Sequence, residues 1–325
     1  MASNITILIT GCAGFIGSHT TQALLNQGFD IIGVDNINDY YNPEWKQQNI
    51  NNLKYENNFT FNRTDITHQE EMEKIFKEQK EKNQPIQKIV HLAARAGVRP
   101  SIEQPLLYQK VNIQGTLNLL ELARKYSVEQ FVFASTSAIY GEQKKIPFNE
   151  DDPVNQPVSP YAATKKAAEL LCYTYSHLYQ IKSTCLRFFT VYGPAGRPDM
   201  APYLFTQALL NNQAINKYGD GSTQRDYTYI DDIVSGVCAA VNNPFEYEII
   251  NLGNNQPVSL NEFINILEEI TEKKAVINQL PTQPGDVPRT YADIGKAQRL
   301  LGYQPTTSIK EGLSKFVEWY RINRL

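Results

Sequence analysis

Tyr161 and Lys165 have the spacing of two groups that act together on one proton. Ser159 is a good helix N-cap and Pro160 a good first helical residue, so a helix is predicted to begin here. Tyr161 then lies in its first turn, with Lys165 one turn later on the same face. A free tyrosine has a pKa of about 10, and a neighbouring ammonium lowers it by stabilising the phenolate. We therefore predict that Tyr161 is a general base and that Lys165 tunes it.

A hydroxyl-rich loop at 134–141 follows an apolar run at 131–133. If that run is a strand of a parallel sheet, the loop leaves the strand end at which ligands bind. Thr136 there could relay a proton or bond a substrate oxygen. The alternative is a turn whose hydroxyls satisfy only their own backbone. The Tyr-x-x-x-Lys spacing is itself common, so both motifs depend on the surrounding fold for their weight.

Three glycines spaced as G-x-x-G-x-x-G, Gly11, Gly14 and Gly17, connect the first apolar run to a predicted helix. Such glycines let the chain turn tightly and let a pyrophosphate approach the helix N-terminus. Asp35 ends the second predicted strand, 18 residues after Gly17. A carboxylate there accepts the hydroxyls of an adenosine ribose and repels a 2′-phosphate, which favours NAD over NADP. A plain turn is the alternative, but strand, helix and acid are all in place.

Strands and helices alternate along the first 190 residues. The short apolar strands lack polar alternation, which indicates burial on both faces. We predict an α/β fold with a Rossmann-type, doubly wound parallel sheet. The predicted strands are 5–10, 31–35, 59–62, 88–92, 131–133 and 184–189, and the predicted helices are 15–26, 70–82, 106–126 and 160–179.

The pattern changes after residue 190, where Gly, Pro, Asn and Asp become frequent. A buried-type strand at 248–252 is expected to return to the main sheet. Ser-x-x-Glu capping pairs at 259–262 and 308–311 each precede an amphipathic helix. We predict an NAD-binding domain from residues 1–190 plus about 230–254. A smaller α/β substrate-binding domain is predicted from about 191–229 plus 255–325.

Composition excludes several classes of function. The chain has 325 residues with 31 basic and 34 acidic side chains, a net charge of −3, so nothing attracts it to a nucleic-acid backbone. We expect no membrane span, because no apolar run reaches the required length. The four cysteines form no CxxC pair and the four histidines no HxxxH pattern, so we predict neither a disulfide framework nor a metal site. A reducing, cytoplasmic location fits this cysteine usage.

Taken together, these motifs resemble those of the extended short-chain dehydrogenase/reductases that act on nucleotide sugars. The shared motifs are TGxxGFIG, Asp35-Asn36, HLAA at 91–94, Asn112, the Ser/Thr loop, Tyr-x-x-x-Lys and RDYTYIDD at 225–232, spread over nearly the whole chain. Stretches at 34–41, 187–201 and 283–287 look like those of one subgroup, the UDP-glucuronate 4-epimerases. Cys12, Arg95, Ala195 and Arg289 depart from the usual pattern, and Arg95 is the one expected near the cofactor.

The resemblance implies a role for each matched residue. Tyr161 is the base, Lys165 tunes it and binds the nicotinamide ribose, and Thr136 assists at the sugar 4-hydroxyl. The implied NAD-binding residues are Gly11, Gly14, Phe15, Ile16, Gly17, Asp35, Asn36, Asp65, Ile66, Leu92, Ala93, Ala94, Asn112, Tyr161, Lys165 and Phe188. The implied residues for the UDP-sugar are Thr136, Ser137, Thr190, Arg197, Asn216, Tyr218, Arg225, Gln283 and Asp286. Within that set, positions 216 and 218 meet the uracil, 225 the diphosphate, and 283 and 286 the UDP ribose.

The implied activity is an NAD-dependent 4-epimerase that interconverts UDP-glucuronate and UDP-galacturonate through a 4-keto intermediate. Similar 4,6-dehydratases carry Asp-Glu where Ser137 and Ala138 stand, and UDP-glucuronate decarboxylases carry a glutamate in place of Ala138. An epimerase for UDP-glucose or UDP-N-acetylglucosamine is the main alternative, and Thr190 and Arg197 favour the acidic sugar. A non-catalytic NAD-binding regulator is a further alternative, although its relatives can lose the tyrosine or lysine retained here.

Two further expectations come with alternatives. The guanidinium of Arg197 could bind the sugar carboxylate, or it could pair with Asp199 or the diphosphate. The helices at about 106–126 and 161–180 carry more apolar residues than one buried face needs, which predicts a homodimer through a four-helix bundle. The alternative is that all of these residues face the sheet. Examples are Leu106, Leu107, Val111, Leu117, Leu119, Leu120 and Leu122.

Overall fold

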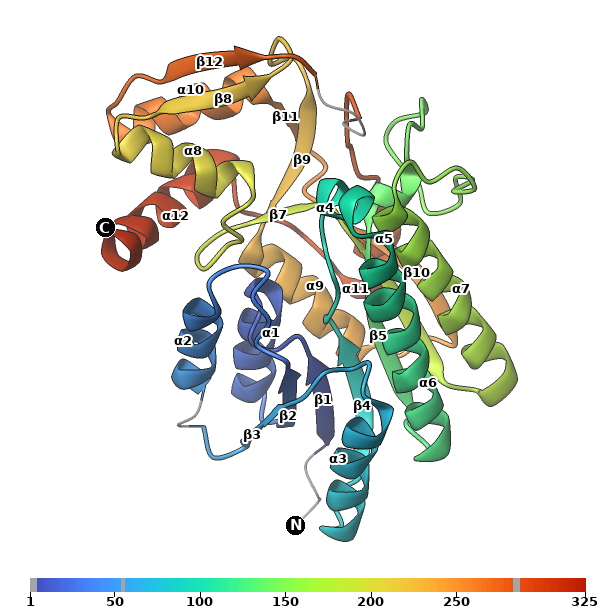
Figure 1. Ribbon diagram of the computed structural model, residues 1–325. Helices are drawn as coiled ribbons and strands as arrows, with labels where there is room; N and C mark the ends of the chain where they lie inside the picture. The colour runs from blue at the N-terminus through green and yellow to red at the C-terminus, as the bar shows by residue number, and fades with distance from the viewer. Residues whose placement is uncertain (1–4, 54–55, 283–286) are drawn as a thin grey trace. The chain divides into compact units, whose positions relative to one another are not determined.

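The computed structural model describes residues 5–53, 56–282 and 287–325, and the chain forms two compact units. The first unit consists of Met1–Gly141, Pro153–Arg187 and Val234–Ile250. The second consists of Glu142–Asp152, Phe188–Ile233 and Asn251–Leu325. Residues 142–152 therefore cluster with the second unit, although the sequence analysis placed them with the first. Figure 1 labels the elements of both units.

A seven-stranded sheet is the centre of the first unit, in the order β10-β6-β5-β4-β1-β2-β3. The strands from β3 to β5 pair in parallel, which confirms the predicted fold class. The strands are β1 (Thr6–Thr10), β2 (Asp30–Asp35), β3 (Phe59–Arg63), β4 (Ile86–His91), β5 (Gln130–Thr136), β6 (Lys182–Phe188) and β10 (Tyr247–Leu252).

The register of these strands brings their carboxyl ends to one edge. Thr10 is paired with Val34 on β2 and with His91 on β4, so the three strands end level. The strand order reverses between β1 and β4, which are neighbours. Open α/β sheets bind their ligands at this kind of switch point. The glycine turn after β1 and the HLAA segment after β4 therefore meet where a ligand is expected.

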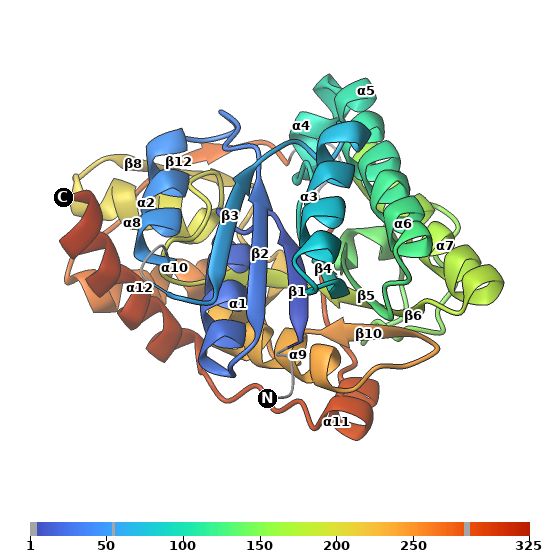
Figure 2. The ribbon, with the colours of Figure 1, turned by 90° about the horizontal axis from the view of Figure 1, so that it is seen from below.

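Helices cover both faces of the sheet. Figure 2 shows α1 and α9 on one face and α3, α6 and α7 on the other. Beneath α3, α6 and α7 lies a continuous apolar core that includes Leu8, Leu119, Phe131 and Cys172. The helices of this unit are α1 (Phe15–Asn26), α2 (Pro43–Leu53), α3 (Gln69–Glu81), α4 (Val98–Glu103), α5 (Pro105–Tyr108), α6 (Gly115–Lys125), α7 (Pro160–Tyr179) and most of α9 (Ile230–Asn242).

The helix predicted over 106–126 forms, but a π-helical turn interrupts its α-helical hydrogen bonding. After α5 the chain makes a π-helical turn at Gln109–Gln114 before α6 begins. Asn112 lies in this turn with its side chain buried and bonded to the backbone of Arg95. A π-helical turn places one more residue in a turn than an α-helix does, and such turns often mark functional sites. A periodicity of 3.6 residues cannot show this interruption.

The second unit contains a three-stranded sheet, β11-β9-β7, and a separate pair, β12-β8. Helices α8, α10 and α12 pack against one another and enclose an aromatic core in which the rings of Tyr227 and Phe263 stack 4.7 Å apart. Ser259 and Ser308 cap α10 and α12 as predicted, each accepting the N–H three residues later. The elements are β7 (Thr190–Tyr192), α8 (Ala201–Leu210), β8 (Ala214–Tyr218), β9 (Gln224–Tyr229), β11 (Pro257–Ser259), α10 (Leu260–Thr271), β12 (Val276–Leu280), α11 (Gly295–Leu301) and α12 (Ile309–Arg324). Among the described residues, no helix is both long and apolar enough to cross a membrane.

Candidate active site

The glycine turn lies where only glycines fit. Gly11 has φ +75°, and a Cβ there would lie 2.7 Å from the backbone nitrogen of Ala93. A Cβ at Gly17 would lie 1.9 Å from the Gly11 oxygen. The turn leads into α1, whose N-cap, Gly14, has no side chain to bond the first N–H groups. Open N–H groups at a helix N-terminus suit a pyrophosphate, so this turn fits a dinucleotide.

Asp35 is held at the end of β2 by backbone N–H groups. Its Oδ2 accepts from Ala13 at 3.2 Å and its Oδ1 from Ile37 at 2.8 Å. Burial raises the pKa of this carboxyl, while these hydrogen bonds and the charge of Lys46 oppose the rise. Asn36 beside it donates to Asp65 at 2.7 Å. The structure thus brings together the acid and amide groups predicted for the adenosine end of NAD.

Asn112 joins the loop after β4 to α7. Its Oδ1 accepts from the Arg95 N–H at 2.8 Å, and its Nδ2 donates to the Arg95 carbonyl at 3.0 Å. Nδ2 also lies 3.2 Å from the hydroxyl of Thr164, which itself donates to the carbonyl of Tyr161. The predicted cofactor residues Leu92–Ala94 lie in this loop, between His91 at the end of β4 and Arg95. Asn112 therefore connects the cofactor side of the site to the helix of the predicted base.

His91, at the end of β4 and the first residue of the HLAA motif, is a buried neutral imidazole for which the sequence suggested no role of its own. Its Nδ1 lies 2.7 Å from the hydroxyl of Thr10 and its Nε2 3.0 Å from that of Thr116. Thr116 donates its proton to the Asn112 carbonyl, so it accepts from Nε2–H, and Thr10 then donates to Nδ1. Burial, with help from the charge of Lys165, lowers the pKa of His91 well below its usual value. The uncharged ring thus links Thr10 on β1 to Thr116 on α6.

The predicted acid–base helix forms as expected. The hydroxyl of Ser159 accepts the Ala162 N–H at 3.1 Å, and Tyr161 lies in the first turn of α7. The Tyr161 ring meets the edge of the Tyr108 ring, with centroids 6.2 Å apart. Lys165 is only 3% exposed, and its Nζ lies 4.3 Å from the centroid of the Phe133 ring. Burial lowers the pKa of Lys165 to about 8.

Thr136 ends β5, and its hydroxyl accepts the N–H of Ala138 at 3.2 Å. This bond opens a 3-10 turn, Ser137–Tyr140. It matches the local turn that the sequence analysis gave as the alternative, yet a hydroxyl that accepts one bond can still donate its own proton. Both β5 and the 3-10 turn pack against α7. The segments that carry Thr136, Tyr161 and Lys165 are therefore neighbours in the first unit.

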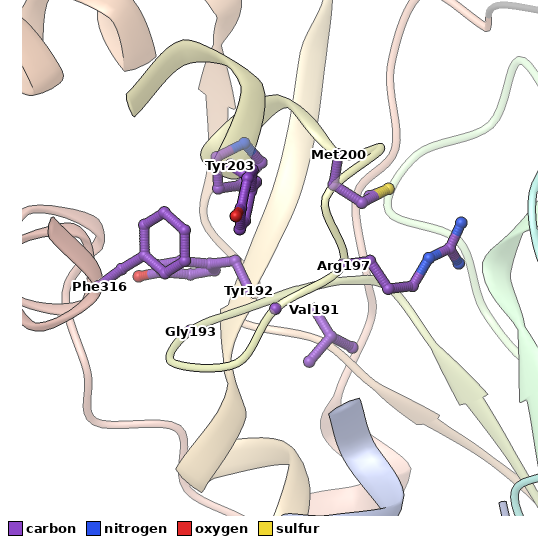
Figure 3. Close-up of a pocket in the computed structure, with 9 residues that line it drawn as sticks. Val191, Tyr192, Gly193, Arg197, Met200, Tyr203 and Phe316 are labelled. Carbon is purple, nitrogen blue, oxygen red and sulfur yellow. The ribbon is translucent and has the colours of Figure 1, made fainter. Parts of the chain in front are cut away.

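The residues predicted for the acidic sugar lie in the second unit. Thr190 begins β7, and Arg197 lines a small pocket with Val191, Tyr203 and Phe316. Figure 3 shows the Arg197 guanidinium pointing away from the rings of Tyr203 and Phe316. It forms a two-pronged ion pair with Asp199, Nε to Oδ1 at 3.0 Å and Nη2 to Oδ2 at 2.5 Å. This pairing is the alternative stated above, and a role toward substrate stays a prediction.

The residues predicted for the UDP group lie on other strands of the second unit. Asn216 and Tyr218 are on β8, where Asn278 donates to the Asn216 side chain at 2.8 Å. Arg225 is on β9, and its Nη1 donates to the carbonyl of Gln224. Phe188, predicted for NAD, is buried at the end of β6. The predicted ribose ligands Gln283 and Asp286 lie outside the described residues.

Comparison with known proteins gives a consistent result along the whole chain. Residues 8–316 match the family described as GDP-mannose 4,6 dehydratase. A UDP-glucuronate 4-epimerase of Thermodesulfobacterium geofontis is 48% identical over 97% of this chain and 96% of its own. The UDP-glucuronic acid 4-epimerase of Bacillus cereus, solved with UDP-glucuronic acid and NAD, has a TM-score of 0.90 at 38% identity, covering 98% of this chain and 99% of its own. A UDP-glucose 4-epimerase of Thermotoga maritima, solved with UDP-glucose, has a TM-score of 0.88 at 35% identity, covering 98% and 99%.

Proposed function

Because the chain belongs to the GDP-mannose 4,6 dehydratase family of extended short-chain dehydrogenase/reductases, we propose that it is an NAD-dependent 4-epimerase that interconverts UDP-glucuronate and UDP-galacturonate. One observation carries the proposal: the full-length similarity to UDP-glucuronate 4-epimerases in a chain that keeps Thr136, Tyr161 and Lys165. The chain lacks the acidic side chains that dehydratases and decarboxylases use after the loop threonine, because Ser137 and Ala138 stand at those positions.

The proposed reaction begins at the sugar 4-hydroxyl. Tyr161 takes its proton as the phenolate, and the hydroxyl of Thr136 bonds the same oxygen. With a pKa of about 8, Lys165 is mostly an ammonium at neutral pH and stabilises that phenolate. The chemistry that bound NAD supplies is removal of a hydride from C4 and its return to the opposite face. The 4-keto sugar turns over in the site between these two events, and Tyr161 gives the proton back.

The residues present fit NAD. The glycine turn leads into α1, whose first N–H groups have no capping side chain, which suits a pyrophosphate. Asp35, fixed by two backbone N–H groups, can accept the ribose hydroxyls and disfavours a 2′-phosphate. Asn36 and Asp65 complete this end of the site. We assign the nicotinamide ribose to Lys165.

With an acidic sugar, the protein must also prevent decarboxylation of the 4-keto intermediate. Oxidation at C4 makes a β-keto acid, which loses carbon dioxide fastest when its carboxylate stands perpendicular to the carbonyl plane. An epimerase must hold the carboxylate away from that alignment, and a guanidinium fork is suited to do so. Arg197 already binds the carboxylate of Asp199 with both prongs, which supports its suitability as a carboxylate ligand. In this proposal the substrate carboxylate takes that place, with Thr190 as a second donor.

A UDP-glucose 4-epimerase is the second candidate, because the Thermotoga enzyme has a similar fold, but its 35% identity is lower than the 48% and 38% of the two UDP-glucuronate 4-epimerases. The chemistry at C4 is the same, so only the sugar-binding residues separate the two. If Arg197 stays bound to Asp199 during catalysis, only the Thr190 hydroxyl remains for a sugar carboxylate, no charged group binds it, and the neutral sugar becomes the better substrate.

We also propose a homodimer in which two helical segments, 105–125 (α5 to α6) and α7, pack against those of a second copy. Leu119, Leu120 and Leu122 are buried against the sheet, but Leu106 is 78% exposed. On α7 the exposed apolar residues are Leu170, Tyr173, Leu178 and Tyr179. A four-helix bundle would cover this face. A monomer mass by light scattering at micromolar protein would refute the dimer. We further propose a cytoplasmic location, which suits four free cysteines.

Chromatography of the products tests the proposed function. The purified protein is incubated with UDP-glucuronate and, in a parallel reaction, with UDP-glucose, without added NAD. We expect UDP-galacturonate from the first reaction at a much higher rate than UDP-galactose from the second. Faster turnover of UDP-glucose supports the second candidate, a UDP-pentose as main product indicates a decarboxylase, and bound NAD without turnover of either sugar indicates a regulator.

A further inference from the structure

A fully buried ion pair joins α7 to β6 in the first unit. Glu169 is 0% and Arg187 1% exposed. The guanidinium donates from Nε to Oε1 at 2.9 Å and from Nη2 to Oε2 at 3.0 Å. Burial alone would raise the pKa of Glu169, but the hydrogen bond and charge of Arg187 lower it below its usual value. Both groups are therefore charged at neutral pH.

A contribution to the stability of the fold does not explain well why the protein has a buried ion pair here. Removing two charges from water is costly, and well-packed apolar replacements for a buried pair are often neutral or stabilising. Removing only one partner is destabilising, because it leaves an uncompensated charge. The contacts that the pair makes with its surroundings therefore indicate what it does.

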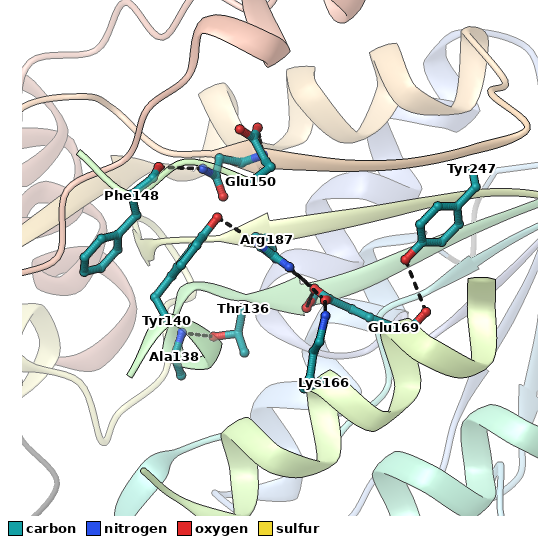
Figure 4. Close-up of polar contacts among 11 residues, drawn as sticks. Thr136, Ala138, Tyr140, Phe148, Glu150, Lys166, Glu169, Arg187 and Tyr247 are labelled. Atoms are coloured by element: carbon teal, nitrogen blue, oxygen red, sulfur yellow. Dashed lines mark hydrogen bonds and ion pairs between the residues drawn. The ribbon is translucent and has the colours of Figure 1, made fainter. Parts of the chain in front are cut away.

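The pair binds both ends of one short segment, Ser135–Tyr140. Ser135 donates from Oγ to Glu169 Oε1 at 2.6 Å. Arg187 donates from Nη1 to the hydroxyl of Tyr140 at 2.9 Å, and its guanidinium lies 4.9 Å from the centroid of that ring. Figure 4 shows the Tyr140 hydroxyl and Lys166 meeting the ion pair, with Thr136 bonded to Ala138 at the start of the turn. Ser135 directly precedes Thr136, and Tyr140 closes the 3-10 turn that Thr136 opens.

The same pair is fixed to the helix of the proposed base. Glu169 lies on α7 four residues after Lys165 and eight after Tyr161, which places the three on successive turns of one helix face. Lys166 Nζ also lies 3.3 Å from Glu169 Oε2. The charge of Glu169 acts on Lys165 as well, since it raises a pKa that burial lowers.

We propose that the Glu169–Arg187 ion pair is a positioning device that holds the Thr136 hydroxyl in register with Tyr161. The proposal rests on the roles assigned above to Thr136 and Tyr161 in 4-epimerisation. Neither charged residue touches the sugar in this scheme: both act through the Ser135–Tyr140 segment. A misplacement of about 1 Å at a reacting group can lower a rate by about 10²-fold, so a rigid segment has a direct catalytic consequence.

The test removes the hydrogen bonds between the ion pair and the Ser135–Tyr140 segment while leaving both charged residues in place. The double variant Ser135→Ala/Tyr140→Phe removes both bonds to the segment and keeps Glu169 and Arg187. We expect kcat for UDP-glucuronate to fall by roughly 10- to 100-fold, with KM within about twofold and parental NAD content. The matched control is Gln130→Met at the other end of β5, which removes the buried bond from Gln130 to the Ala240 carbonyl. It should lower the thermal midpoint without changing kcat.

A double-mutant cycle asks whether the ion pair acts through Thr136. Thr136→Val is measured in the parent and in the double variant. We expect a loss of at least tenfold in the parent and less than about threefold in the double variant, because the hydroxyl there is already out of register. Equal losses in the two backgrounds, or a parental kcat in the double variant, would overturn the proposal. No loss from Thr136→Val in the parent would overturn it too, by removing the assigned role of Thr136.

A second variant guards against misfolding of the first. Glu169→Leu/Arg187→Met replaces both charges at once, so stability should stay near the parent's. We expect this second variant to have a thermal midpoint near that of the parent and a kcat as low as that of Ser135→Ala/Tyr140→Phe. A restored midpoint together with a parental kcat would show that the pair only supports the fold. A parent without turnover of either UDP-sugar would refute the proposed function itself, which is a different outcome from all of these.

Discussion

Replacement of Lys165 by methionine should make the protein more stable and less active. Lys165 is 3% exposed, and burial lowers its pKa from 10.5 to about 8. That difference means that the folded protein holds the ammonium at a cost of about 3 kcal/mol relative to the unfolded chain at neutral pH. Methionine has a similar length and no charge, so it removes this cost. For a chain of 325 residues, about 3 kcal/mol corresponds to a rise in thermal midpoint of roughly 4 °C.

The stability difference between Lys165→Met and the parent should depend on pH. Between pH 8 and 10.5 the unfolded chain binds more protons at Lys165 than the folded protein does, so the parent gains stability as the pH rises. The advantage of Lys165→Met is therefore full below pH 8 and disappears as the pH approaches 10.5. Thermal midpoints of both proteins, freed of nucleotide with charcoal, should be measured across this range.

Lys182→Met on β6 serves as the control, because Lys182 is exposed and its replacement should change stability by less than about 0.5 kcal/mol at any pH. A Lys165→Met protein that is less stable than the parent at pH 7, with a difference that stays constant up to pH 10.5, would refute the reasoning from burial. In the same variant, turnover should fall by at least about 10²-fold and begin at higher pH, because the phenolate loses its neighbouring cation.

The other predictions concern the base, the sugar, the cofactor and metals. Tyr161→Phe should lower kcat by at least about 10²-fold with NAD content unchanged, and parental turnover would show that the base is misassigned. Arg197→Ala should lower kcat/KM for UDP-glucuronate by roughly 30-fold, about 2 kcal/mol, the low end for a charge pair because Arg197 is 23% exposed, while UDP-glucose is little affected. Equal losses for both sugars would place Arg197 at the nucleotide or in the fold instead. NAD should copurify and bind more tightly than NADP because of Asp35, and equal affinity for the two would contradict this. Activity should survive EDTA, and a loss that zinc or magnesium restores would overturn the metal-free mechanism.

Much of the first unit could be predicted because its signals are local. The strand before Gly11, the helix after it and the acid at Asp35 follow within one βαβ unit, whose glycines and apolar runs are contiguous. The cap at Ser159 likewise fixes where α7 begins and hence the phase of Tyr161 and Lys165. The caps of α10 and α12 are local in the same sense and were predicted for the same reason.

Elements that depend on distant contacts were not predicted. Helix α2 is polar and buries only Lys46, Ile50 and Leu53, so it has no apolar stripe to detect. Helix α9 begins without a Ser or Thr cap within a run of Ile, Val and Ala that also suits a strand. The short strands β7, β9 and β11 pair with one another across long stretches of sequence.

Long-range polar contacts were missed for a related reason. The π-helical turn at Asn112 follows from bonds to the loop at Arg95, and the Glu169–Arg187 pair links a helix to a strand. Charged residues are mostly exposed, so a sequence alone does not reveal which of them are buried together. The positions of the chemical groups were therefore predictable, whereas the contacts that orient them were not.

The most direct test of the account is the fate of the hydrogen at C4. UDP-glucuronate carrying deuterium at C4 is incubated with the purified protein without added NAD, and the products are followed by NMR. Our account predicts UDP-galacturonate with the deuterium retained at C4, because the hydride removed from the sugar is returned to the same molecule. Loss of the deuterium to solvent, a requirement for added NAD in every turnover, or a UDP-pentose as the main product would contradict it.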